Sequence, residues 1–190
     1  MKRLIIYILV LIFIFSAGIG MAQAGEKEDR KVKRAEKMRL KEEEANLNQE
    51  KFLSLVNDQD FVLETYALFG RYNSRIGVSP NTNFISIHGD QLTLQTGNGI
   101  THGYNGVGGI TINGRITNYK VKTSKNNKNL SVMVQYTSPA LGHSTLNLNI
   151  QSNGSARAFV TDNWGGRATF QGEIVSPENA RIYKGLALPI

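Results

Sequence analysis

The chain has 190 residues, a formal net charge of +7 and no cysteine. The lack of cysteine excludes disulfide bonds, thiol catalysis, thiolate metal sites and a lipid-modified N-terminal cysteine. The length suits a single domain with a substantial core. Its basic residues are scattered rather than gathered into a stripe with interleaved aromatic residues, so nucleic acid is not an expected partner.

The first 24 residues have the three parts of a secretory signal peptide. Lys2 and Arg3 form a basic start, residues 4–15 are all apolar, and residues 22–24 read Ala-Gln-Ala, a small-x-small cleavage site. The apolar run is shorter than the roughly 20 residues that span a membrane. An uncleaved anchor is the alternative if residues 16–21 are counted. We expect cleavage after Ala24, a periplasmic or secreted location, and no membrane span in the mature protein.

Residues 25–51 are predicted to form a charged α-helix that precedes the main domain, residues 52–190. The segment is rich in Glu, Lys, Arg and Ala, which are strong helix formers. Its apolar residues are sparse and form no broad stripe until Leu47, after which the helix is expected to dock onto the domain. Two interpretations stay open, a solvated spacer and a stalk that binds a partner.

The chain after Asp60 is predicted to be mainly β. Apolar and polar residues alternate with the period of two that is typical of antiparallel strands with one buried face. We predict eight strands, at about 60–70, 83–88, 91–97, 107–123, 129–138, 143–151, 155–161 and 166–175. Short Gly- and Asn-rich connections indicate an antiparallel meander. An eight-stranded meander that closes on itself forms a lipocalin-like barrel, and an open β-sandwich is the alternative.

A β-bulge is predicted inside the fourth of these strands. The apolar residues up to Ile116 fall on one parity, and those from Tyr119 onward fall on the other. Because a shift of one residue moves side chains to the opposite face, an extra residue is needed near Thr117 or Asn118.

The chain shows no catalytic constellation. It has no G-x-S-x-G motif and no well-placed pair of carboxylates, and its three histidines, His88, His102 and His143, lack the spacing of a metal site. The Gly-rich segment 97–109 does not match a phosphate-binding loop and is predicted to be a flexible connection. The protein is therefore expected to be no enzyme and to hold no metal or cofactor.

Three residues are candidates for ligand contact. His102 and Tyr104 lie in the Gly-rich segment, and Trp164, the single tryptophan, lies in a turn. Aromatic residues at loops are common contact residues for ligands. Successive connections of a meander alternate between its two ends, so the third and seventh connections share one end. Tyr104 and Trp164 are therefore predicted to flank one opening.

Several spaced motifs resemble the domain of unknown function 4251 family. They lie at residues 83–90 (NFISIHGD), 105–119 (NGVGGITINGRITNY), 165–173 (GGRATFQGE) and 181–185 (RIYKG), and the resemblance covers about residues 50–186. The resemblance implies an exported envelope protein with a calycin-like β-barrel, and it implies no activity or catalytic residue. Family members often carry a lipoprotein cysteine, which this chain lacks.

Two functions follow as hypotheses. The first is a non-catalytic envelope module that binds a small apolar ligand or lipid, because an eight-stranded barrel is wide enough to hold one small molecule. The second is a structural or protein-interaction protein of the envelope that uses the charged helix. A cavity in the barrel would favour the first, and a barrel filled by its own Leu, Ile and Phe would favour the second.

Overall fold

A computed structural model describes residues 2–70, 73–98, 103–124 and 129–187, with side chains described from Arg30 onward. The chain divides into two compact units, Met1–Glu44 and Ala45–Ile190. The first unit is the greater part of helix α1 (Lys2–Asn57), in which residues 30–44 are all exposed. The expected helix at 25–51 lies inside α1, which is longer at both ends. Within the described part of the chain, no helix has the length and apolar character needed to cross a membrane.

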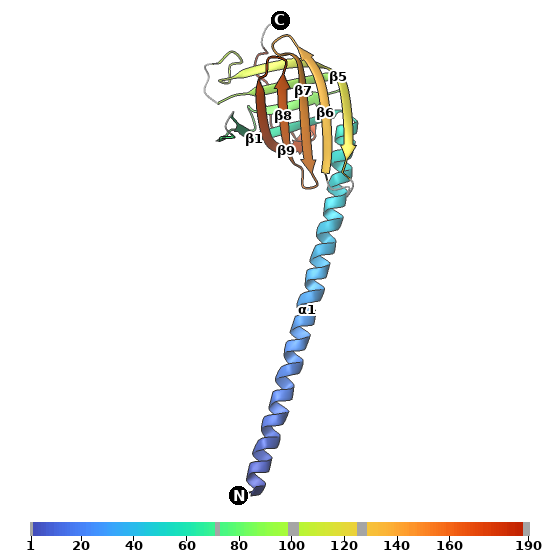
Figure 1. The fold of residues 1–190 in the computed structure, drawn as a ribbon, viewed down its shortest axis with the longest axis vertical. Coiled ribbons are helices and arrows are strands. Elements are labelled where there is room, and N and C mark those ends of the chain that lie inside the picture. The colour runs from blue at the N-terminus through green and yellow to red at the C-terminus, as the bar shows by residue number, and fades with distance from the viewer. Residues whose placement is uncertain (1, 71–72, 99–102, 125–128, 188–190) are drawn as a thin grey trace. The chain divides into compact units, whose positions relative to one another are not determined.

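The second unit is a closed antiparallel barrel (Figure 1). Its strands are β1 (Asp60–Phe69), β2 (Arg75–Gly77), β3 (Phe84–His88), β4 (Gln91–Thr96), β5 (Ile110–Thr123), β6 (Asn129–Ser138), β7 (Gly142–Gln151), β8 (Ser155–Asp162) and β9 (Arg167–Val175). Neighbours along the chain pair in order from β3 to β9, β1 pairs with β3, and the pairing of β1 with β9 closes the ring. A 3-10 helix, η1 (Pro177–Asn179), follows β9.

The eight-stranded barrel predicted from the sequence is confirmed, and the open sandwich is not formed. The predicted bulge is also confirmed, because the register of β5 against β6 shifts between Ile116 and Asn118. Two features were not predicted. Strand β2 adds a ninth strand that pairs with β1 alone, and β1 has a bulge of its own between Thr65 and Ala67.

The interior of the barrel is filled by its own side chains. One continuous cluster of buried apolar residues includes Phe61, Ile87, Leu148 and Phe170, and it draws on every strand except β2. The end of α1 contributes Phe52 and Val56 to the same cluster, which accounts for the rise in apolar content after Leu47.

The end of α1 is held at the barrel by one hydrogen bond and one close contact. The Tyr119 hydroxyl donates to the Val56 carbonyl at 2.6 Å. A Cβ added to Gly154, where φ is +84°, would lie 2.6 Å from the Phe52 ring, so a glycine is required beneath this side chain. These contacts place β5 and the turn between β7 and β8 against the last turns of the helix.

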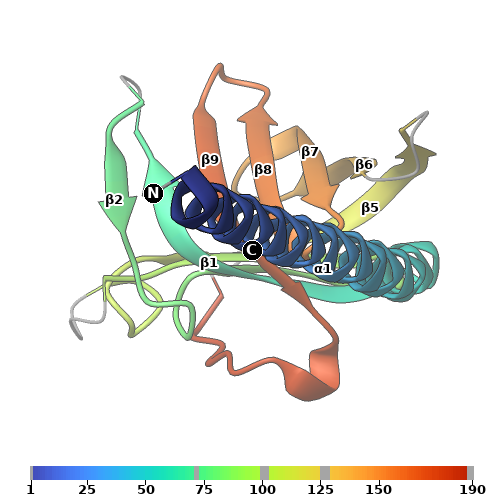
Figure 2. The ribbon, with the colours of Figure 1, turned by 90° about the horizontal axis from the view of Figure 1, so that it is seen from below.

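Residues 181–187, which we call the C-terminal strap, cover the outer face of β4. Figure 2 shows the chain after β9 running along the side of the barrel opposite β8 and β9. Leu92 and Leu94 of β4 face the core, whereas Thr93 and Gln95 are buried on the other face under the strap. Strand β4 therefore has no solvent-exposed face along most of its length.

Candidate functional site

A groove lies at one end of the barrel, where β1 changes its partner. The pairing of β1 with β3 ends at Glu64 and Phe84. Beyond the bulge, β1 continues to Phe69, and the chain folds back so that β2 takes the place of β3 beside it. Strand β2 and the end of β4 therefore both lie at this rim, and the two strands do not pair with each other.

Two buried amide side chains build the opposite wall of the groove. Asn83 donates to the Gly97 carbonyl at 2.7 Å and accepts from the Gly97 N–H at 2.9 Å. Asn105 accepts from the N–H groups of Val107 and Gly109 and donates to the Thr96 carbonyl. These bonds satisfy the backbone of a connection that has no regular structure.

The described part of the Gly-rich segment is therefore fixed rather than loosely attached. Asn105 and Val107 are buried, and Gly109 lies so close to Thr96 that a side chain at this position would collide with the Thr96 carbonyl. Glycine at residues 103–109 permits close backbone packing around a buried amide, and the flexibility of this connection stays a prediction. Residues 99–102 lie outside the described residues.

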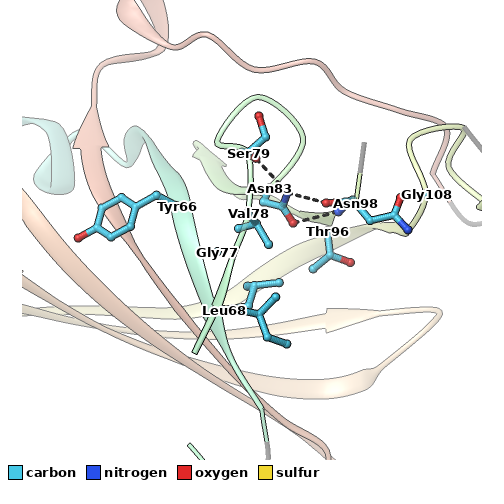
Figure 3. A pocket seen from close by; sticks show the side chains of 11 residues that line it. Tyr66, Leu68, Gly77, Val78, Ser79, Asn83, Thr96, Asn98 and Gly108 are labelled. Carbon is cyan, nitrogen blue, oxygen red and sulfur yellow. Dashed lines mark hydrogen bonds between the residues drawn. The ribbon is translucent and has the colours of Figure 1, made fainter. Parts of the chain in front are cut away.

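The rim groove, as we call it, has a volume of about 650 Å³, within the range of roughly 300–1,000 Å³ typical of ligand pockets. Figure 3 shows its lining side chains. The lining residues are Tyr66, Leu68, Ile76, Gly77, Val78, Ser79, Asn83, Thr96, Gly97, Asn98 and Gly108. None of them carries a formal charge. Ile76 is 54% exposed and Gly77 has no neighbouring atom within 4 Å of an added Cβ, so both faces of β2 are open at these two positions.

The free edge of β2 has unpaired backbone groups. The Val78 N–H donates to the Tyr66 carbonyl and the Gly70 N–H donates to the Ser74 carbonyl, both at 3.0 Å. In an antiparallel pair, hydrogen-bonded positions alternate with positions whose N–H and C=O point away from the partner strand. Arg75 and Gly77 are the positions that point away from β1, and β1 is the one strand that pairs with β2 in the described chain.

The strap and the groove share one polar network. Gln95 is 0% exposed and forms four hydrogen bonds. Its amide nitrogen donates to the carbonyls of Thr82 and Tyr183, and its oxygen accepts from the Gly185 N–H and the Thr111 hydroxyl. Thr111 in turn accepts from Asn105, so the strap, the end of β4 and the groove wall form one connected unit.

The structure does not place the predicted ligand residues in the rim groove. Tyr104 is 85% exposed, and Trp164 is 69% exposed with its ring against Gly142. His102 lies outside the described residues. Trp164 sits in a turn closed by Asp162, whose carboxylate accepts from the N–H groups of Trp164 and Gly166. Ligand contact by these three residues stays a prediction.

The Gly-rich connection from β4 to β5 and the Trp164 turn from β8 to β9 lie at the same end of the barrel, as the alternation of ends predicted. Residues 165–167 of the Trp164 turn share a hollow with Phe69, Gly70 and Asn73 near the tip of the β1–β2 hairpin. The Gly-rich connection instead shares the rim groove with the base of the hairpin, at residues 76–79. That Tyr104 and Trp164 flank one opening stays a prediction, and the β1–β2 hairpin at this end of the barrel was not predicted.

Two tyrosines of the barrel have pKa values raised mainly by burial. Burial raises the pKa of Tyr119 well above its ordinary value. Burial also raises the pKa of Tyr136 to about 12, with Asp162 adding to the rise and Ser144 opposing it.

Over the described residues, no three acidic or histidine side chains gather where they could hold a metal ion. His88 and His143 are instead paired with Asp60 and Thr137.

Comparison with known proteins defines the family. The model of a domain of unknown function, DUF4251, matches residues 43–174, so the chain belongs to the DUF4251 family. A solved structure of a DUF4251 family protein from Bacteroides eggerthii DSM 20697 is similar, with 22% sequence identity and a TM-score of 0.56. The match covers 68% of this chain and 88% of that chain, and at this identity it establishes the shared fold alone. No curated protein matches the chain.

Proposed function

We propose that the protein is a non-catalytic binding module exported to the cell envelope, and that its ligand binds in the rim groove outside the barrel core. The observation that carries this proposal is the contrast between two regions of the barrel. The interior is filled by a continuous apolar cluster, whereas the rim groove is open, uncharged and built on buried hydrogen bonds. A fixed wall favours binding because little ordering is required when the ligand arrives.

The filled interior bears on the two hypotheses drawn from the sequence. A small apolar ligand inside the barrel would have to displace side chains such as Phe61, Leu148 and Phe170, which are at most 1% exposed. Displacing well-packed core residues is unfavourable. The filled interior therefore favours an interaction protein over a module that holds a small apolar ligand inside its barrel, and a binding site outside the core agrees with this.

The groove lining supports binding rather than catalysis. Its described hydroxyl groups come from Tyr66, Ser79 and Thr96, and among the lining residues that the structure describes there is no histidine, carboxylate or lysine. A hydroxyl nucleophile needs an adjacent base to be activated, and a general acid or base must lie within hydrogen-bond reach of the substrate. The lining offers neither.

Export rests on the basic, apolar and small-residue parts of residues 1–24.

Thermal unfolding in the presence of candidate ligands tests the proposal. The panel consists of fatty acids, phospholipids, envelope glycans and peptides, each added to the purified protein. A ligand at a hundred times its Kd adds about 2.7 kcal/mol of stability, and this should raise the Tm of a domain of this size by about 8 °C.

Two matched variants locate the binding site. Ser79→Trp fills the groove from an exposed lining position and should abolish the Tm shift. Ser131→Trp, at an exposed position on β6, should leave the shift unchanged. A ligand whose shift survives Ser79→Trp, or a panel in which no compound moves the Tm, would refute the rim groove as the binding site.

A further inference from the structure

The free edge of β2 defines which kind of ligand the rim groove suits, if the groove is the binding site proposed above. We propose that the groove binds an extended segment of another polypeptide, which adds to the barrel as a strand beside β2. The segment would form antiparallel or parallel backbone hydrogen bonds with Arg75 and Gly77, the two positions whose N–H and C=O groups point away from β1.

The position of the groove agrees with strand addition. Strands β2 and β3 follow one another along the same edge of β1, and β4 pairs with β3 but not with β2. The space beside β2 is bounded on its other side by Thr96, Gly97 and Asn98, which continue from the end of β4. The groove thus occupies the place in the sheet where a further strand would lie. Its lining includes residues of both faces of β2, as expected of a groove that runs along a strand edge.

The chemistry of the lining distinguishes a peptide from other envelope molecules. A phospholipid or an acidic glycan carries charge, and none of the described lining residues has a charged side chain to pair with it. Sugar rings commonly stack on exposed aromatic faces. The aromatic lining residue, Tyr66, turns away from Asn83 and Thr96 (Figure 3), and its hydroxyl accepts a hydrogen bond from Gln171. A neutral peptide backbone needs only the donors and acceptors that the edge of β2 supplies.

Arg75, a charged residue at the edge of β2, sets a preference for the sequence of the bound segment. Arg75 is exposed, and within the described residues no carboxylate pairs with it. It lies at the end of β2 that is nearer to the hairpin tip. The preferred segment therefore has small or apolar residues along the groove and an acidic residue opposite Arg75.

The test begins with selection of heptapeptides from a displayed library of unrestricted sequence on the purified protein. Selected sequences are made as synthetic peptides, and their affinity is measured by calorimetry. Each peptide is then N-methylated at one backbone amide at a time. Methylation at alternate residues should weaken binding about tenfold, and methylation at the residues between should have little effect, because only every second N–H of an added strand faces β2.

A matched pair of protein variants tests the same hydrogen bonds from the other side. Gly77→Pro removes an N–H that points away from β1, so it should weaken the selected peptides about tenfold without breaking a β1–β2 bond. Gly77→Ala keeps the N–H, and the added Cβ meets open space, so affinity should stay within about threefold of the original.

The outcomes separate this inference from the proposed function. Loss of the alternating pattern, or equal binding to Gly77→Pro and Gly77→Ala, would overturn strand addition. If no peptide is selected but a lipid or glycan gives a Tm shift that Ser79→Trp abolishes, the groove binds a ligand of another class and the strand-addition inference fails alone. If no compound of either kind depends on the groove, both proposals fail. The peptide methylation series remains decisive if Gly77→Pro is poorly folded, because it leaves the protein unaltered.

Discussion

Replacing Gln95 with alanine should loosen the C-terminal strap and destabilise the barrel. The side chain is fully buried and forms four hydrogen bonds, two of them to the strap residues Tyr183 and Gly185. A buried hydrogen bond contributes about 1 kcal/mol, so the four together contribute about 4 kcal/mol. The two strap groups can bond to water once the strap moves, whereas Thr82 and Thr111 remain covered. We therefore expect a loss of about 3 kcal/mol.

Urea unfolding measures this loss. With a slope of about 2 kcal/mol per molar urea, the midpoint of the Gln95→Ala variant should lie about 1.5 M below that of the original protein. Limited trypsin digestion should also cut faster at Arg181 and Lys184, because the strap is held in its extended form partly by Gln95.

Gln91→Ala is the control, since Gln91 lies on the same strand and is exposed. Its midpoint should stay within about 0.3 M of the original, because exposed substitutions usually change stability by less than 0.5 kcal/mol. If Gln95→Ala behaves like Gln91→Ala in both assays, the strap contributes nothing through this network, and the account of a polar unit joining the strap to the groove wall is wrong.

Two further predictions concern export and pH. Edman sequencing of the protein from a periplasmic fraction should begin at Gly25, and a mature chain that keeps Met1 would refute cleavage. Burial raises the pKa of Tyr136 from 10.0 to about 12, so the folded state favours the neutral phenol. This stabilisation is complete below pH 10 and is lost as the pH rises towards 12. Between these values the unfolding free energy should fall by about 2 kcal/mol more than in Tyr136→Phe; equal slopes would contradict the shift.

The strands could be predicted because their burial follows from local alternation. Leu130, Val132, Val134 and Tyr136 occupy one parity in the sequence and all are buried in the structure. The bulge in β5 was predicted for the same reason, since strongly apolar residues on either side of Thr117 fall on opposite parities. A pattern of this kind marks a face directly, so no knowledge of distant contacts was needed.

The bulge in β1 and the strand β2 are not marked by any such pattern in the sequence. Around the bulge in β1 the sequence reads Thr-Tyr-Ala, three residues that fit either face of a sheet, so a slip of one residue leaves no mark. Strand β2 is the tripeptide Arg-Ile-Gly, too short to show alternation, and it forms because β3 has already ended beside β1. Its existence depends on pairing partners that are distant in the sequence.

The candidate site could not be predicted from residue types. Tyr104 and Trp164 were selected because aromatic residues at loops are typical contact residues, but neither lines the rim groove. The groove is made from the edge of β2 and from scattered apolar and uncharged polar side chains, which carry no distinctive pattern in the sequence. Asn105 illustrates the difficulty, because an asparagine among glycines is typical of an exposed turn, yet it is buried and accepts two backbone hydrogen bonds.

The core cluster, the strap and the rim groove occupy different parts of the barrel, so substitutions in each part should have different effects. The core cluster fills the interior, and the strap covers the outer face of β4, so substitutions in either region act first on stability. The exposed groove residues Ile76, Gly77 and Ser79 lie outside both regions. Substitutions there alter the groove without disturbing the core or the Gln95 network. The binding preference that we propose for the groove would therefore vary independently of the barrel that supports it, as expected when a ligand site is placed on a rigid scaffold.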